Sequence, residues 1–204
     1  MKIAVLLVVA LALAPSLVLA QDARAPKVIQ EQAGNITNVR IEGSLAATRQ
    51  LDCIDLSAVA GDQTPPDLYT AVLKCITQGD YQRAARLFFV ASVYSRFDAQ
   101  RIVDRSAGAG GQVLILRTFA SVSPEQKQLF SKAIDTLTKD PQNFQAWCLD
   151  IKRLGPPKYF PRYLILHGLN AFTADRPLEN ALLPDFDLEA NWARVLETNV
   201  RCPK

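Results

Sequence analysis

The first twenty residues most constrain what this chain can fold into, because they have the organisation of a secretory signal peptide. Lys2 supplies a positive charge, residues 3–13 form an unbroken apolar run, and Pro15 precedes the small residues that end at Ala20. The run is too short to span a bilayer, and polar residues follow Ala20 directly. We therefore expect cleavage after Ala20, no membrane insertion after cleavage, and a soluble product that folds in the bacterial periplasm.

Four cysteines, Cys53, Cys75, Cys148 and Cys202, would enter that oxidising compartment together. An even number there favours two disulfides, for which three pairings are possible. We favour Cys53–Cys75 and Cys148–Cys202, because each would hold a terminal segment against a nearby helix. A zinc site is the alternative, but the cysteines lack the close spacing of zinc ligands and the chain has one histidine. We expect no metal and no cofactor.

Charge and length indicate one domain without a polyanionic partner. The chain has 23 basic and 20 acidic residues, and the basic ones are scattered, which disfavours nucleic-acid binding. We divide it into a signal peptide (residues 1–20), an extended or flexible N-terminal arm (21–60) and a helical domain (61–204). Within the arm, residues 21–34 are expected to be a mobile leader, and the apolar alternation over 36–41 permits a short strand.

From residue 64 onward the chain carries repeated helix signals. A capping residue followed by proline occurs at Thr64-Pro65, Ser123-Pro124 and Asp140-Pro141. Glycine follows an apolar stripe at Gly79 and at Gly155, where we expect helices to end.

Further helix starts are expected at Asp80, at Phe97-Asp98 and at Asp187. The apolar run over 113–119 suits a strand or a helix, and its helical neighbours favour a helix. The connections between these segments are short, as in compact domains. The predicted fold is therefore all-α, a compact bundle of about seven helices with an extended N-terminal arm and two disulfides.

The predicted helix pair around Gly79 resembles one tetratricopeptide unit. The resemblance covers residues 71–94 and rests on Gly79-Asp80-Tyr81 at the turn and Ala84-Ala85 on the second helix. In that family, stacked pairs form a concave peptide-binding surface, so the resemblance implies a repeat-like helical scaffold. No second copy follows at the expected period, and stable arrays generally need at least three. An ordinary helical hairpin is the plainer interpretation.

The most unusual segment is the proline-rich run over residues 155–163. Its three prolines fix the backbone and remove three amide donors, which predicts a rigid, extended connection. Tyrosine and arginine, which often anchor protein interfaces, are both present in it. The predicted protein-binding residues are Lys158, Tyr159, Arg162, Tyr163 and His167.

On this hypothesis the side chains of Tyr159 and Arg162 should be exposed. The alternative is that Phe160, Tyr163 and Leu164 only hold the connection against the core.

The C-terminal third carries a longer pattern. A Trp-Cys pair is followed by Gly-Pro-Pro-x-Tyr-x-Pro-Arg-Tyr-x-Ile-x-His-Gly-Leu, then Ala-Phe, Asp-Phe-Asp and a terminal Cys-Pro. This resembles a group of small, mostly uncharacterised exported helical proteins of proteobacteria, to which no reaction is attached. Some small cysteine-paired periplasmic proteins of this general kind are immunity proteins, which neutralise toxins injected by neighbouring cells. The matching residues are Trp147, Cys148, Gly155 to Pro157, Tyr159, Pro161 to Tyr163, Ile165, His167 to Leu169, Ala171, Phe172, Asp185 to Asp187, Cys202 and Pro203.

Catalytic signatures are weak. The single histidine, His167, excludes sites that need two imidazoles, although a serine or cysteine nucleophile paired with it remains possible. Two carboxylate pairs are the nearest candidates for a glycosidase, namely Asp52 with Asp55 and Asp185 with Asp187.

We therefore expect a non-enzymatic protein-binding module of the periplasm, most specifically a toxin-neutralising immunity protein. Its expected partner is another protein, and a secreted bacterial toxin is one candidate. An envelope hydrolase that acts on peptidoglycan and a repeat-like helical scaffold are the alternatives.

Overall fold

The computed structural model describes residues 27–33, 35–173 and 178–203, and the predicted signal peptide lies outside them. These residues form a mainly helical molecule with the disulfides Cys53–Cys75 and Cys148–Cys202. The predicted all-α class and the favoured pairing are therefore confirmed. Within the described ranges, no helix combines the length and the apolar character needed to cross a membrane.

Two long helices, α1 (Pro65–Gln78) and α2 (Tyr81–Arg101), form an antiparallel hairpin at the centre of the molecule. Both predicted starts are confirmed. Thr64 and Asp67 form a reciprocal capping box at α1, and Asp80 caps α2 by accepting a hydrogen bond from the backbone of the first turn. Gly79 ends α1 in a left-handed conformation that glycine adopts readily.

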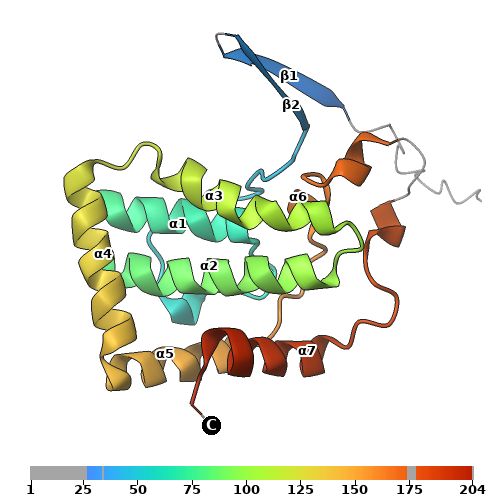
Figure 1. Cartoon of the computed structure of the whole chain (residues 1–204). Coiled ribbons are helices and arrows are strands. Elements are labelled where there is room, and N and C mark those ends of the chain that lie inside the picture. The colour runs from blue at the N-terminus through green and yellow to red at the C-terminus, as the bar shows by residue number, and fades with distance from the viewer. Residues whose placement is uncertain (1–26, 34, 174–177, 204) are drawn as a thin grey trace, which may run out of the picture.

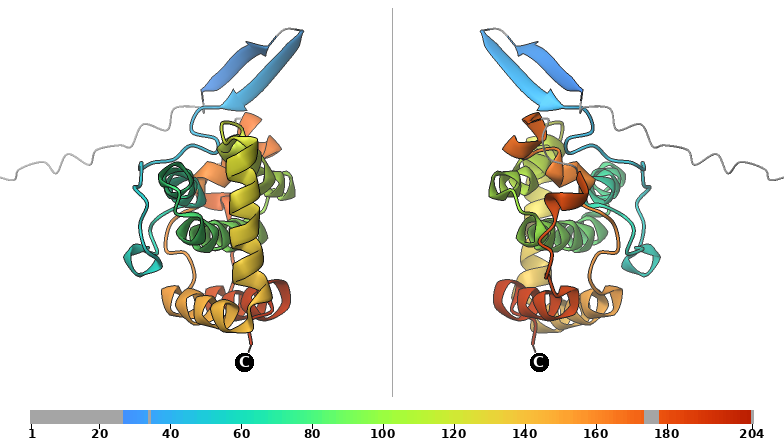
Figure 2. Two further views of the ribbon diagram at one scale, coloured as in Figure 1. Left: turned by 90° about the vertical axis from the view of Figure 1, so that its left-hand side faces the viewer. Right: turned by 90° about the vertical axis from the view of Figure 1, so that its right-hand side faces the viewer.

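The remaining helices surround this hairpin (Figure 1). The helix α3 (Gly110–Phe119) packs on α1, and α4 (Pro124–Lys139) crosses the end of the layer against α2. The helix α5 (Pro141–Leu154) turns away from α4 at a corner. It forms a second layer with α7 (Leu188–Arg194), as both views in Figure 2 show.

The shorter elements complete this architecture. The single turn α6 (Arg162–Ile165) follows the proline-rich run, and a π-helical segment (Val195–Val200) continues α7. The starts predicted at Ser123, Asp140 and Asp187 are confirmed, as is a helix over 113–119. In the described ranges, one short 3-10 turn precedes α1, at Leu56–Ala58, and others lie between later helices, at Arg105–Ala109, Leu169–Phe172 and Leu178–Ala181.

The core is built around α2 and is rich in aromatic side chains. Tyr94 and Phe97 are fully buried and meet Trp192 of α7 edge to face. Nearer the start of α2, Phe88 meets Phe130 of α4 in the same manner. These contacts join the two helical layers through α2, so residues on the inner faces of α2 are shielded from water.

The N-terminal arm contains a β-hairpin that the sequence only partly indicated. The strand β1 (Val28–Ala33) pairs antiparallel with β2 (Ile36–Ile41), and the hairpin stands out from the helices in Figure 1. The expected strand over 36–41 is confirmed. The expectation of a mobile leader is wrong for residues 28–33, because their backbone groups pair with β2; residues 21–26 and 34 lie outside the described ranges.

A second correction concerns the helix start expected at Phe97-Asp98. The helix α2 continues without a break to Arg101, and Asp98 lies fully buried within it. An aspartate that caps a helix accepts backbone amides of the first turn. The Asp98 carboxylate instead accepts hydrogen bonds from side chains, two of which come from the proline-rich run.

Candidate functional site

The proline-rich run, residues 155–163, passes from the α5 layer across α2 to α6 (Figure 1). Gly155 ends α5, and the Lys158 amide donates a hydrogen bond to the carbonyl of Gly61, which lies just before α1. The side chains then alternate as in an extended chain. One set faces the core and consists of Pro157, Tyr159, Pro161 and Tyr163, while the other faces outward and consists of Lys158, Phe160 and Arg162.

The inward tyrosines belong to a buried polar cluster, which we call the clamp: Asp98, Arg101, Tyr159 and Tyr163. The Tyr159 and Tyr163 hydroxyls each donate to Asp98 Oδ2 at 2.8 Å. Arg101 donates to Asp98 Oδ1 from Nε at 3.0 Å and from Nη2 at 2.6 Å. Nη2 also donates to the Tyr159 carbonyl at 2.9 Å. The buried carboxylate is thus both paired and hydrogen-bonded, as a buried charge requires.

The protonation of the clamp follows from its burial. Burial raises the pKa of the Asp98 carboxyl, and Arg101 together with the two tyrosine hydroxyls opposes this by stabilising the charged form. Burial and the nearby Asp98 charge raise the pKa of Tyr159 and Tyr163 well above the ordinary tyrosine value. Both hydroxyls therefore remain protonated at neutral pH and act as donors. The clamp joins α2 to the proline-rich run.

The outward side chains Lys158, Phe160 and Arg162 form what we call the strip. Phe160 is 42% exposed, and Lys158 and Arg162 are exposed on either side of it. Neither cation forms a side-chain hydrogen bond or ion pair with any residue in the described ranges. The backbone beneath them is held by prolines and by the clamp, so the strip loses little conformational freedom on binding.

The structure corrects part of the predicted binding site. Lys158 and Arg162 are exposed, as the interface hypothesis required for Arg162. The expectation of an exposed Tyr159 is wrong: this side chain is half-buried, and Tyr163 is only 4% exposed. The reason is the Asp98 carboxylate, which needs the two hydroxyls as donors.

Phe160 is the strip residue that the sequence-based prediction missed. It was assigned to the core under the alternative hypothesis, whereas the structure leaves it exposed. The signal for it was available: in an extended run, position 160 lies on the same side as positions 158 and 162.

His167 lies elsewhere, at the base of the β-hairpin, where β2 leads into the helices. Its Nδ1 atom is 3.3 Å from Ser44 Oγ, and its ring approaches Gly110 at the start of α3. The structure therefore pairs the histidine with a serine. Ser44, however, is only 4% exposed, and no carboxylate within the described ranges orients the ring as a nucleophile–base pair requires. This pair is a structural hydrogen bond.

The environment of His167 predicts an acid-sensitive fold. Burial lowers the pKa of His167, and the Arg117 charge lowers it further. Below about pH 6.5 the unfolded chain takes up a proton that the folded chain binds less readily, so stability should fall as the pH falls through this range.

Urea unfolding of the wild type and His167→Gln at about pH 7.5 and pH 5.5 measures this effect. The wild type should lose more stability between the two values than the variant. Because His167 is the single histidine, the difference between the two proteins reports on it alone. Equal losses in both would contradict the prediction.

Three of the four carboxylates considered for a hydrolase have structural partners. Asp52 accepts hydrogen bonds from the Cys53 amide and the Gln78 side chain, and Asp55 forms an ion pair with Arg83. Asp187 caps α7. These contacts account for the three carboxylates without a catalytic role.

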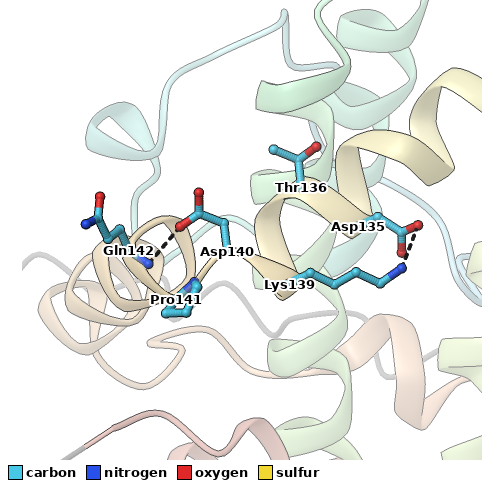
Figure 3. A pocket seen from close by; sticks show the side chains of 6 residues that line it. All are labelled: Asp135, Thr136, Lys139, Asp140, Pro141 and Gln142. Carbon is cyan, nitrogen blue, oxygen red and sulfur yellow. Dashed lines mark hydrogen bonds and ion pairs between the residues drawn. The ribbon is translucent and has the colours of Figure 1, made fainter.

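Two surface hollows lie on other elements. The first, about 690 Å³, lies at the corner between α4 and α5, and Figure 3 shows its lining side chains. Its charged groups are engaged, since Asp135 pairs with Lys139 and Asp140 caps α5. The second, about 440 Å³, lies between α5 and the C-terminal helix and is lined by Lys152, Glu189, Trp192, Ala193, Leu196, Glu197, Cys202 and Pro203.

Comparisons with protein-family models, with curated proteins and with solved structures each found no match to this chain. Within the described ranges, no three His, Cys, Asp or Glu residues are grouped so that they could hold a metal ion. The strip, held in place by the clamp, is the candidate binding surface.

Proposed function

We propose that this protein is a protein-binding module of the bacterial periplasm, and most specifically an immunity protein that neutralises a toxin. The observation that carries the proposal is the strip, in which an exposed aromatic ring lies between two cations that have no ion-pair partner in the described ranges. Aromatic and arginine side chains on a rigid support are the usual anchors of protein interfaces.

The clamp supports this function because the residues that stabilise the run are different from the residues that would bind a partner. The inward residues Tyr159 and Tyr163 hold the run against α2. The outward residues are left free to contact a partner at little entropic cost. Lys158 and Arg162 would meet carboxylates of the partner, and Phe160 would enter an apolar depression between them.

The compartment is consistent with the proposal. Two disulfides fit an oxidising environment outside the cytoplasm. The periplasm is the compartment of this kind in which a protein with a bacterial signal peptide would meet an injected toxin.

The product of an adjacent gene that encodes a secreted toxin is the partner to test. The two purified proteins should migrate as one complex in size-exclusion chromatography at micromolar concentration, and the complex should block the toxin. Independent migration of the two proteins would end the immunity proposal for that pair.

Within such a complex, Phe160→Ala and Arg162→Ala should each weaken binding by about 1–2 kcal/mol, the scale of an interface hot spot. Their melting temperatures should change little, because both side chains are on the surface. A binding isotherm and a melting curve for each variant make the measurement. Lys132→Ala on α4, an exposed cation outside the strip, is the matched control and should leave affinity unchanged.

Tyr163→Phe should show the opposite pattern, with lower stability and nearly unchanged affinity, because it removes a donor to Asp98. Loss of stability in the strip variants with intact binding would show that the run serves only the core.

A further inference from the structure

The Lys158 end of the strip lies on the turn formed by residues 60–63, just before α1. The Lys158 amide donates a hydrogen bond to the Gly61 carbonyl at 2.8 Å. The lysine side chain then runs over the same glycine. A Cβ atom on Gly61 would lie 3.2 Å from Lys158 Cγ, 3.3 Å from Cδ and 3.6 Å from Cε. The ammonium group, one bond beyond Cε, therefore lies close to this turn.

The turn itself is closed by two reciprocal hydrogen bonds. The Ala60 amide donates to Gln63 Oε1, and the Gln63 amide donates to the Ala60 carbonyl, both at 3.1 Å. Asp62 follows Gly61 in this turn, and neighbouring Cα atoms are about 3.8 Å apart. A lysine that lies over Gly61 is therefore within reach of the Asp62 carboxylate by side-chain rotation alone.

The Asp62 carboxylate is instead paired with Arg49. Arg49 Nη2 donates to Asp62 Oδ2 at 2.7 Å. The backbone of Arg49 is fixed from below, because its amide donates to the fully buried carboxylate of Asp67 at 2.9 Å. The hydrogen bond from Arg49 stabilises the charged form of the Asp62 carboxyl and lowers its pKa. Asp62 is therefore ionised and has a cation, whereas the Lys158 ammonium has no partner in the described ranges.

We propose that Arg49 is a positioning residue of the strip: it holds the Asp62 carboxylate and so leaves the Lys158 ammonium free for a carboxylate of the partner. The inference rests on the proposed function and adds to it a residue outside the strip. Without Arg49, Asp62 becomes an internal competitor, which pairs with Lys158 and occupies one of the two cations of the strip.

The competition follows from the chemistry of lysine. Its charge is compact and lies on a flexible stem, so the ammonium group turns readily toward a nearby carboxylate. A pair between Asp62 and Lys158 would leave Arg162 as the unpaired cation of the strip. Cations around an interface raise the rate at which an acidic partner associates. Loss of Arg49 should therefore slow association, and added salt should reduce the difference from the wild type.

Binding isotherms with the toxin encoded by the adjacent gene give the first test. Arg49→Ala should raise the Kd by about two- to fivefold, the range of an exposed ion pair. Arg49→Ala combined with Asp62→Asn removes the competitor as well and should restore the wild-type Kd. Lys139→Ala is the matched control, because it removes one positive charge from an exposed ion pair on α4, and it should leave the Kd unchanged. A combined variant as weak as Arg49→Ala would overturn the inference.

Titration of the Asp62 carboxyl by NMR, in the mature protein without a partner, gives the second test. In Arg49→Ala the pKa of Asp62 should stay below the ordinary aspartate value, because Lys158 takes the place of Arg49. Adding Lys158→Ala should raise it to about 3.9. An ordinary pKa in Arg49→Ala that the loss of Lys158 leaves unchanged would overturn the inference while the proposed function stands. If the wild type bound no toxin, the proposed function would fail, and this titration would still decide whether Arg49 keeps Asp62 from Lys158.

Discussion

Replacing Asp98 with alanine should destabilise the protein by about 3–5 kcal/mol, the cost of removing one partner of a buried ion pair. The substitution leaves Arg101 as a buried charge without its carboxylate. It also leaves the Tyr159 and Tyr163 hydroxyls without their acceptor. Few other single substitutions in the described part of the chain would leave so many buried polar groups without a hydrogen-bond partner.

Urea unfolding of the wild type and the Asp98→Ala variant measures the loss. Asp135→Ala is the matched control, since Asp135 also pairs with a cation one turn along its helix but lies at the surface. Its loss should be about 0.5 kcal/mol or less. If Asp98→Ala cost no more than Asp135→Ala, the clamp would not hold the proline-rich run.

Removing the Cys148–Cys202 disulfide should destabilise the protein by about 4 kcal/mol, and removing Cys53–Cys75 by about 3 kcal/mol. The difference follows from the loops that the bonds close, since their cysteines are separated by 54 and 22 residues. A longer loop restricts the unfolded chain more strongly. The Cys148–Cys202 bond also ties the end of the chain to α5.

The paired variants Cys148→Ala with Cys202→Ala and Cys53→Ala with Cys75→Ala test this order in denaturant without reductant. The wild type in reductant is the control and should lose at least as much stability as either variant. An equal loss in the two variants, or a larger one for Cys53–Cys75, would contradict the loop-length argument.

Helix boundaries illustrate what local sequence encodes. The starts at Thr64, Ser123 and Asp140 agree with the structure, and each combines a capping side chain with a proline in the first turn. A cap accepts an amide within the same turn, and proline is tolerated there because its missing amide has no intrahelical partner. Such signals need no knowledge of the rest of the fold.

Asp98 illustrates what local sequence does not encode. It has the residue type of a helix cap, and the sequence indicated a helix start at this point. Its partners Tyr159 and Tyr163 are 61 and 65 residues away along the chain. No pattern within a helical turn of Asp98 distinguishes a buried acceptor of distant hydroxyls from a cap.

The sequence by itself determined the helical class and most helix boundaries, because these depend on neighbouring residues. It allowed three disulfide pairings, and the tertiary structure decided between them by placing Cys53 beside Cys75 and Cys148 beside Cys202. Only the tertiary structure decided which side of the proline-rich run is buried. Alternation defined two faces, but the buried carboxylate of Asp98 selected the one that carries Tyr159 and Tyr163. It likewise decided that residues 28–33 form a strand, because an extended segment becomes a strand only when another strand satisfies its backbone groups.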